Sequence, residues 1–165
     1  MVENPTYEIE DEFEGPVAGV DEAGRGPWAG PVVAAAVVLD RNSTPEGLRD
    51  SKTLTEKRRR ELAAMLWKSA RIGVGVSSVE EIDTMNILRA SLLAMARAVA
   101  NLSIVPAIAI VDGCIKPKLS CPAYTVIKGD AKSLSIAAAS IVAKTVRDRM
   151  MLELARDYPE YGWRS

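Results

Sequence analysis

The chain has 165 residues, 48% of them hydrophobic and 26% charged, so it is long enough for one domain with its own core. It has no histidine, which excludes serine or cysteine catalysis through an imidazole and any metal site that needs one. No apolar stretch approaches the ~20 residues that cross a bilayer, and the acidic N-terminus is not a signal peptide. Cys114 and Cys121 do not form a Cys-x-x-Cys pattern, so we expect reduced thiols in a cytoplasmic protein, with a disulfide as the less favoured alternative.

The net charge of −1 hides an uneven distribution. Residues 1–16 hold six of the 22 acidic residues and no Lys or Arg, so the rest of the chain carries 21 basic against 16 acidic residues. A basic body is compatible with binding a phosphate backbone. We expect residues 1–16 to form an acidic flexible leader and residues 17–165 to form the folded domain.

Two apolar runs open the folded part of the chain. Residues 17–22 and 32–39 lie on either side of a turn that contains Gly24, Arg25 and Gly26. This pattern predicts two antiparallel strands joined by a short connection. The glycines permit positive φ and a close approach of the backbone to a ligand.

The next predicted element is a helix with Thr55 as its N-cap. Apolar spacing places Leu62, Met65 and Leu66 on its buried face. Its first turns are basic at residues 57–60, although cations at a helix N-terminus oppose the helix dipole. This basic run fits either a solvated face or a ridge that binds phosphates.

The rest of the chain alternates between helices and strands. We expect one helix from residue 78 or 83 to residue 100, with Asn86 in its first turns, and a long helix from residue 133 or 135 to residue 157. Strands separated by helices are at least partly parallel, so the predicted fold is a mixed α/β domain. The short strands of this part are predicted at residues 72–76, 107–111 and 123–127.

Acidic residues follow three predicted strands, at the ends where α/β sheets build their sites. These residues are Asp21 with Glu22, Asp112, and Asp130. Asp112 and Asp130 could each belong only to a turn, but three such positions in a chain without histidine favour a convergent cluster. Carboxylates this close need compensation, which Mg²⁺ or Mn²⁺ with its preference for oxygen ligands would supply. Since neighbouring strand residues point to opposite faces, Glu22 can join only at the strand end or through its backbone carbonyl.

Five blocks of the sequence carry recognisable motifs: Gly-Val-Asp-Glu-Ala-Gly-Arg-Gly-Pro at 19–27, Asp-Ser-Lys-x-Leu at 50–54, Asn-Ile-Leu at 86–88, Val-Asp-Gly at 111–113, and the run from Lys128 to Arg149. These blocks resemble ribonuclease HII of the bacterial type. The match runs in order from about residue 17 to the end of the chain. The resemblance implies a ribonuclease H-like fold, with a five-stranded mixed sheet flanked by helices, and a metal-dependent endonuclease.

The resemblance also implies a reaction. The family hydrolyses the RNA strand of RNA–DNA hybrids and incises 5′ to single ribonucleotides in duplex DNA, leaving 3′-hydroxyl and 5′-phosphate ends. Asp21, Glu22, Asp112 and Asp130 then correspond to the catalytic carboxylates, which bind two Mg²⁺ or Mn²⁺ ions. We expect a monomer that binds hybrids and ribonucleotide-containing DNA, and no membrane.

The resemblance assigns further residues to the substrate. Gly24, Arg25 and Gly26 resemble the segment that senses the 2′-hydroxyl, the group that distinguishes RNA from DNA. The family continues past residue 165, so we expect its C-terminal helical extension to be missing here. Neither Tyr158 nor Tyr161 is given the role of the tyrosine that packs beside the junction nucleotide in relatives. The candidates for phosphate contacts are Lys52, Asn86, Ser133 and Ser135.

Two alternative functions remain open. A truncated form could bind hybrid nucleic acid with little or no turnover. A phosphatase or nucleotidyl hydrolase could use the same acids on small substrates.

Overall fold

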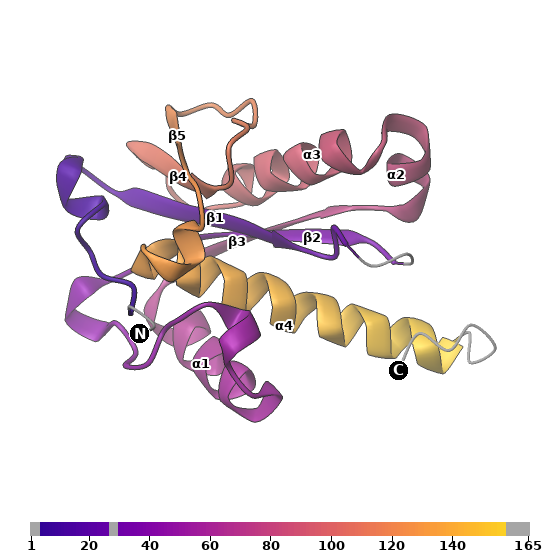
Figure 1. The fold of residues 1–165 in the computed structure, drawn as a ribbon, viewed down its shortest axis with the longest axis horizontal. Helices are drawn as coiled ribbons and strands as arrows, with labels where there is room; N and C mark the ends of the chain where they lie inside the picture. Colours follow the sequence, from indigo (N-terminus) through magenta and orange to yellow (C-terminus); the bar gives the residue numbers. More distant parts are fainter. Residues whose placement is uncertain (1–3, 27–29, 158–165) are drawn as a thin grey trace.

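Five strands form one mixed sheet in the order β3-β2-β1-β4-β5, with helices on both faces (Figure 1). This arrangement confirms the predicted mixed α/β fold. The computed structural model describes residues 4–26 and 30–157; Tyr158 and Tyr161 lie outside these ranges, as does the middle of the turn after β1. The strands are β1 (Val17–Ala23), β2 (Val32–Val38), β3 (Arg71–Ser77), β4 (Ile108–Asp112) and β5 (Ala123–Val126).

The central strand β1 joins the two halves of the sheet. It pairs antiparallel with β2, as predicted, and parallel with β4, although β2, β3 and several helices lie between β1 and β4 in the chain. The outer pairs are antiparallel for β2 with β3 and parallel for β4 with β5. The parallel pairing of β1 with β4 brings the acidic end of each strand to the same region of the sheet.

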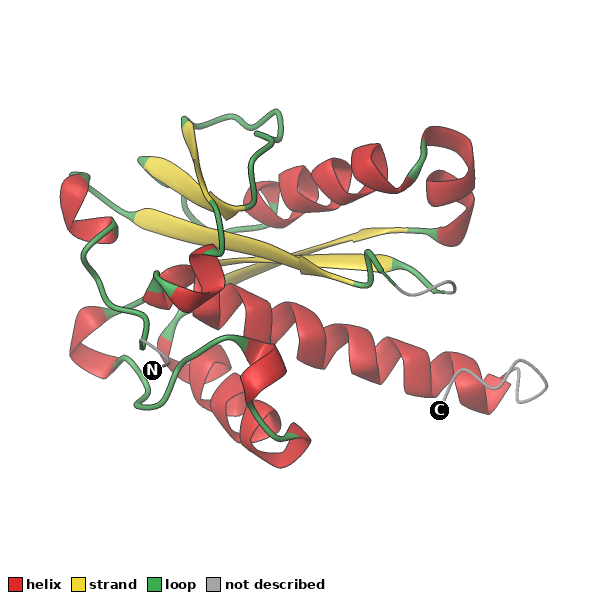
Figure 2. Ribbon diagram, viewed as in Figure 1, coloured by secondary structure: helices red, strands yellow, loops and turns green. Residues whose placement is uncertain are grey.

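Helices cover the sheet as two layers (Figure 2). On one face lie α2 (Val79–Met85) and α3 (Ile87–Ala100), and on the other lie α1 (Glu56–Ser69) and α4 (Leu134–Asp157). A separate hydrophobic cluster fills the space between the sheet and each layer. β2 consists only of Val and Ala because both of its faces are covered.

The helix predicted between residues 78 and 100 is in fact two helices. The helix is interrupted at Asn86, whose φ of 78° is incompatible with a right-handed helix. Its side chain accepts a hydrogen bond from the backbone N–H of Arg89 and so caps α3. Apolar spacing continues across the break, which is why periodicity alone predicted one helix.

Helix α1 begins as predicted. The Thr55 side chain accepts a hydrogen bond from the backbone N–H of Arg58, which confirms the N-cap. Leu62 and Leu66 are fully buried, but Met65 is 45% exposed, so its predicted burial is wrong. Residue 65 lies about 100° around the helix from residue 66, outside the narrow stripe that faces the core.

The expected flexible leader does not match the contacts made by residues 4–16. This segment contains the 3-10 turn η1 (Glu10–Glu12), and Glu10 is buried. Ile9 and Phe13 pack against a small core cluster that includes Ile136 of α4. An acidic composition therefore did not imply a free segment here, because one acid faces inward with two apolar neighbours.

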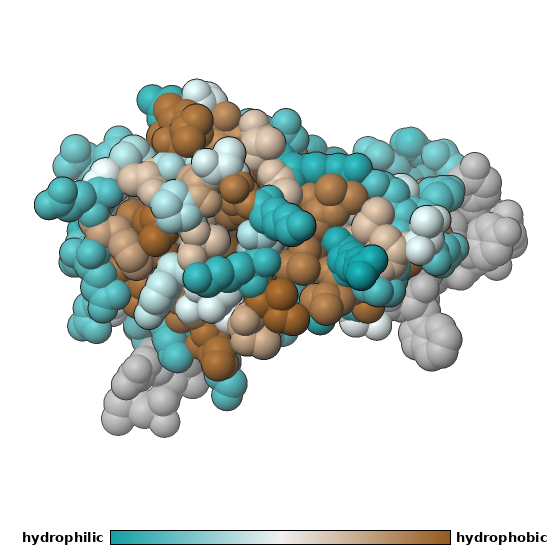
Figure 3. Space-filling model, turned by 90° about the horizontal axis from the view of Figure 1, so that it is seen from above, coloured by the Kyte–Doolittle hydropathy of each residue, from teal (hydrophilic) through white to brown (hydrophobic). Residues whose placement is uncertain are grey.

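The surface mixes apolar and polar side chains. Figure 3 shows them interspersed on the face that carries α3 and β5. Val105 and Ile127 are among the exposed large apolar residues, and single apolar residues of this kind are ordinary on a folded surface. Within the described ranges, no helix has both the length and the apolar character needed to cross a membrane.

Candidate active site

Three carboxylates from distant parts of the chain meet beside the sheet. Asp21 lies in β1 and Asp112 ends β4, so the parallel pairing of these strands brings the two acids together. Asp130 joins them from the 3-10 turn η4 (Gly129–Ala131), which follows β5. One carboxylate oxygen of each residue lies within 4.8 Å of the other two. The strand ends thus bring together three of the four acids that the sequence singled out.

Burial of these acids disfavours their charged forms. Asp21 is only 5% exposed and Asp130 only 7%. Burial, followed by the negative charges of Glu22 and Asp112, raises the pKa of Asp21 well above its usual range. Burial and Asp112 likewise raise the pKa of Asp130. A cluster of this kind is stabilised when protons or a cation neutralise it, and hard divalent ions prefer such oxygen ligands.

Glu22 borders the cluster but does not share its geometry. Its side chain is not among the three whose oxygens converge, in keeping with the alternation of side chains along a strand. Its backbone N–H donates to Asp21 Oδ1 over 2.8 Å. Its Oε2 is buried without a hydrogen-bond partner among the described residues, and burial raises the pKa of Glu22. A cation would satisfy such an oxygen, so the three converging aspartates, with Glu22 beside them, have the chemistry that a divalent metal ion requires.

A lysine borders the cluster on its solvent side. Lys52 lies in η3 (Ser51–Thr53), with Nζ 3.6 Å from Asp130 Oδ2 and 3.7 Å from Asp50 Oδ2. Burial acts to lower the pKa of Lys52, but the nearby carboxylates raise it overall. The side chain is 79% exposed and can therefore reach a bound phosphate. Sequence reasoning gave Asp50 no role; its place directly before Ser51-Lys52 was the available signal.

The turn after β1 rests on a buried arginine of α4. Arg147 is 5% exposed, its Nε donates to the carbonyl of Pro31 over 3.0 Å, and burial lowers its pKa. Gly24 has a φ of +95°, and a Cβ added there would lie 2.1 Å from Arg147 Nε. Arg25 Nη1 lies 4.0 Å from Glu22 Oε1, which connects the turn to the acids. Sequence analysis placed Arg147 only within a motif; a charge on an otherwise apolar helix face was the missed signal.

Comparison with known proteins assigns the family. The family model described as Ribonuclease HII matches residues 18–165. The chain belongs to the ribonuclease HII family. It is 58% identical over 160 residues to "Ribonuclease HII" of Jannaschia sp. (strain CCS1), covering 96% of this chain and 80% of that protein. It is 62% identical over 148 residues to the Ruegeria pomeroyi protein of the same name, covering 89% of this chain and 63% of that protein.

Solved structures agree with this family assignment. Ribonuclease H2 from Pyrococcus horikoshii OT3 has a TM-score of 0.75 and 34% identity, covering 88% of this chain and 78% of that one. The PCNA:RNase HII complex from Archaeoglobus fulgidus has a TM-score of 0.70 and 31% sequence identity, covering 87% of this chain and 78% of that one. The ribonuclease H-like fold is thereby confirmed, and this ribonuclease HII family member is a ribonuclease H-type hydrolase.

Two of the predicted phosphate contacts lie in the interior of this ribonuclease HII. Ser133 is fully buried and Ser135 is 2% exposed. Ser133 Oγ and the backbone N–H of Ser135 both donate to Glu10 Oε2 over 3.0 Å. The structure therefore uses Ser133 to cap the start of α4, and Glu10 of the same chain accepts hydrogen bonds from both serines. Asn86, the third candidate, is exposed at the junction of α2 and α3.

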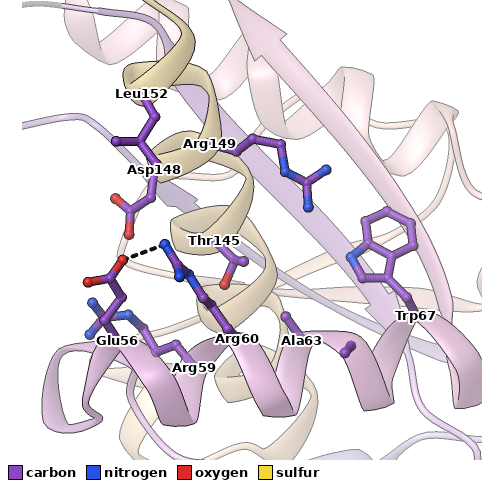
Figure 4. A pocket seen from close by; sticks show the side chains of 10 residues that line it. Glu56, Arg59, Arg60, Ala63, Trp67, Thr145, Asp148, Arg149 and Leu152 are labelled. Carbon is purple, nitrogen blue, oxygen red and sulfur yellow. Dashed lines mark hydrogen bonds and ion pairs between the residues drawn. The ribbon is translucent and has the colours of Figure 1, made fainter. Parts of the chain in front are cut away.

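A groove between α1 and α4 is distinct from the acid cluster. It has a volume of about 360 Å³, and Figure 4 shows Trp67 of α1 and Arg149 of α4 extending along the same part of it. Trp67 is half exposed. The groove combines an aromatic ring with basic and acidic groups, and its charges do not select one kind of ligand.

The basic run at residues 57–60 mostly binds groups of the protein. Arg58 and Arg60 pair with Glu61 and Glu56 of the same helix. Arg59 donates two hydrogen bonds to backbone carbonyls of the segment that precedes α1. These contacts favour a role in stabilising α1 over a ridge that binds phosphates.

Proposed function

We propose that this chain cleaves the RNA strand of RNA–DNA hybrids and also incises 5′ to single ribonucleotides embedded in duplex DNA. Its membership of the ribonuclease HII family supports hydrolysis of hybrids. The observation that carries the proposal is the convergence of three carboxylates within 4.8 Å beside the sheet. We expect products with 3′-hydroxyl and 5′-phosphate ends.

Asp21, Asp112 and Asp130 are the proposed metal ligands, with Glu22 as the fourth acid. Bound Mg²⁺ or Mn²⁺, as two ions, would activate the attacking water and stabilise the leaving oxygen of the phosphodiester. The raised pKa values of Asp21 and Asp130 support this assignment, because they report a site that favours added positive charge. The unsatisfied Oε2 of Glu22 supports it for the same reason.

The protein would select and orient the substrate through groups around these acids. We assign recognition of the 2′-hydroxyl to Gly24, Arg25 and Gly26, whose turn adjoins Glu22. Lys52 would bind a phosphate next to the scissile bond, since its ammonium is exposed beside Asp130. In this role it would exchange one of its carboxylate contacts for the substrate.

Asn86 would bind a phosphate farther along the strand. Its Oδ1 is used to cap α3, but its Nδ2 donor has no hydrogen-bond partner among the described residues. Its φ and ψ of 78° and 165° lie in a region that only glycine adopts readily, and such strain is common at functional positions. Both observations support a role for the exposed amide.

A monomer located in the cytoplasm stays part of the prediction. The free state of Cys114 and Cys121 supports a reducing location. Size-exclusion chromatography with light scattering would test the monomer, and a second species at micromolar concentration would contradict it.

The decisive experiment compares Asp112→Asn with Asp148→Asn on a duplex that contains one ribonucleotide. We expect Asp112→Asn to lower the cleavage rate by more than about 100-fold, because it removes a charged metal ligand. Asp148 lies in α4 and pairs with Lys144, so its variant is the matched control and should retain activity. Gel assays with Mg²⁺, Mn²⁺ or EDTA, and circular dichroism of both variants, provide the measurements.

The outcomes separate the remaining alternatives. Full Mg²⁺-dependent cleavage by Asp112→Asn would overturn the assignment of the acids. Hybrid binding by the wild type without product at any metal concentration would select the binding protein without turnover. Faster hydrolysis of mononucleotides than of hybrid duplexes would select the small-substrate hydrolase.

A further inference from the structure

The segment before β1 is hydrogen-bonded to the start of α4. The backbone N–H of Thr6 donates to the carbonyl of Lys132 over 3.0 Å, and the N–H of Leu134 donates to the carbonyl of Thr6 over 3.1 Å. These bonds form a parallel β-bridge between Thr6 and Ser133. Thr6, near the start of the described residues, is therefore joined to Ser133, which lies three residues after Asp130.

A buried carboxylate completes this junction. Glu10 is 3% exposed, and its Oε2 accepts hydrogen bonds from Ser133 Oγ and from the backbone N–H of Ser135. Ser133 Oγ in turn accepts from the N–H of Ile136 over 3.1 Å. Glu10 and Ser133 together satisfy donors in the first turn of α4, where a negative charge is also favoured by the helix dipole.

Apolar contacts hold the same segment against the strands that lead to the acids. Ile9 and Phe13 pack with Ile110 of β4 and Val126 of β5. The ring of Phe13 meets the ring of Tyr124 edge to face, with centroids 5.6 Å apart. Since β4 ends at Asp112 and β5 leads into η4, the segment contacts the elements that deliver two of the three clustered acids.

The hydrogen bonds continue from this junction to the acid cluster. The backbone N–H of Ser133 donates to the carbonyl of Gly129 over 2.7 Å. The N–H of Gly129 donates to Asp112 Oδ1 over 2.6 Å. Ser133 is thus bonded to Glu10 through its side chain and to η4 through its backbone, and η4 carries Asp130 between these fixed points.

We propose that Glu10 is a positioning residue for Asp130: by holding Ser133 and Ser135, it fixes η4 so that the three carboxylates can bind a divalent cation. This inference rests on the proposed metal-dependent function. Loss of the Glu10 carboxylate leaves the buried donors of Ser133 and Ser135 without an acceptor. We expect η4, which is bonded to Ser133, to shift as these donors find other partners. Residues 4–16 then help to position the carboxylates of the metal site.

The test measures Mn²⁺ binding in the absence of nucleic acid. The variants are Glu10→Ala, Glu10→Gln and the control Glu8→Gln, and the readout is the Mn²⁺ dissociation constant from electron paramagnetic resonance below the melting temperature. We expect Glu10→Ala to weaken binding about 10–100-fold, as for loss of groups that orient metal ligands. Glu10→Gln keeps an acceptor of the same length and should recover most of the affinity, and Glu8→Gln should match the wild type.

Each outcome decides for or against the inference. Unchanged Mn²⁺ affinity in folded Glu10→Ala would overturn it, even if the melting temperature falls, because that result shows a structural role alone. If Glu10→Ala does not fold, Ser133→Ala takes its place, because it removes the hydroxyl that donates to Glu10 Oε2. Weaker Mn²⁺ binding by Ser133→Ala than by Glu8→Gln then supports the inference, and wild-type affinity overturns it. Failure of the wild type to bind Mn²⁺ would contradict the proposed function itself, so the two failures are distinguishable.

Discussion

Two glycines beside Arg25 have different surroundings, although both belong to the turn proposed to sense the 2′-hydroxyl. Gly24 has a positive φ and lies against Arg147, so a side chain there meets both backbone strain and a buried guanidinium. Among the described residues, no heavy atom lies within 4 Å of a Cβ added at Gly26. The fold requires the first glycine, whereas only a ligand would require the second.

We therefore predict that Gly24→Ala destabilises the protein and that Gly26→Ala leaves its stability nearly unchanged. Gly24→Ala should lower the free energy of unfolding by about 1–3 kcal/mol, the usual effect of forcing a non-glycine residue into this conformation. Gly26→Ala should change it by less than about 0.5 kcal/mol but lower cleavage of a single embedded ribonucleotide. Urea denaturation and cleavage assays provide the measurements. A destabilised but fully active Gly26→Ala variant would contradict the assignment.

Asn86 allows a second matched comparison at the level of a residue. Asn86→Ala loses the α3 cap and keeps the strained backbone, so we expect a loss of about 0.5–2 kcal/mol. Asn86→Gly loses the same cap but relieves the strain, and its stability should lie within about 0.5 kcal/mol of the wild type. If the amide binds a phosphate, both variants should bind hybrid more weakly. Equal stability of Asn86→Ala and Asn86→Gly would show that φ at this residue carries no strain.

At the level of elements, a bidentate ion pair between Arg97 and Glu81 joins α3 to α2. Arg97 donates from Nη1 and Nη2 to the two carboxylate oxygens of Glu81, each over 2.7 Å, and also donates to the carbonyl of Val76. Glu81 completes a capping box with Ser78. The hydrogen bonds from Arg97 and from the Ser78 backbone lower the pKa of Glu81 from 4.5 to about 2. The break at Asn86 is thus bridged by side chains.

This pair predicts a pH-dependent contribution to stability. Because the pKa of Glu81 is lower in the folded state than in the unfolded state, its contribution is complete above pH 4.5 and disappears as the pH falls toward 2. The stability difference between wild type and Glu81→Gln should therefore shrink over that interval. Denaturation at pH 7, 4 and 3 measures it, with Glu80→Gln as control. A difference that stays constant with pH would refute the assignment.

At the level of the whole molecule, sequence patterns predicted the regular helices and strands better than the segments that connect them. The strands follow from apolar runs such as residues 32–38, which form one strand because both faces are covered. The acids were predicted because strand ends converge in such sheets. The break at Asn86 was missed because apolar spacing does not report φ. The contacts of residues 4–16 were missed because a charged segment can bury one carboxylate at a helix start 123 residues away.

The metal should also stabilise the entire fold. An ion that binds the proposed site only in the folded state adds about 2.7 kcal/mol to the free energy of unfolding when its concentration is about 100 times the dissociation constant. We predict that Mn²⁺ or Mg²⁺ raises the melting temperature and that EDTA reverses this effect. Calorimetry should show no such rise for Asp112→Asn and a normal rise for Asp148→Asn. An equal rise in both variants would indicate that the ion binds elsewhere.

The parallel pairing of β1 with β4 also affects the order in which the protein becomes active during synthesis. Asp21 emerges early from the ribosome, but its partners Asp112 and Asp130 follow about a hundred residues later. With the proposed assignment of the acids, a nascent chain from which η4 has not yet emerged lacks a complete site, so we expect it not to cut nucleic acid near the translating ribosome. We therefore expect nuclease activity to begin only after η4 has emerged from the ribosome and β4 has paired with β1.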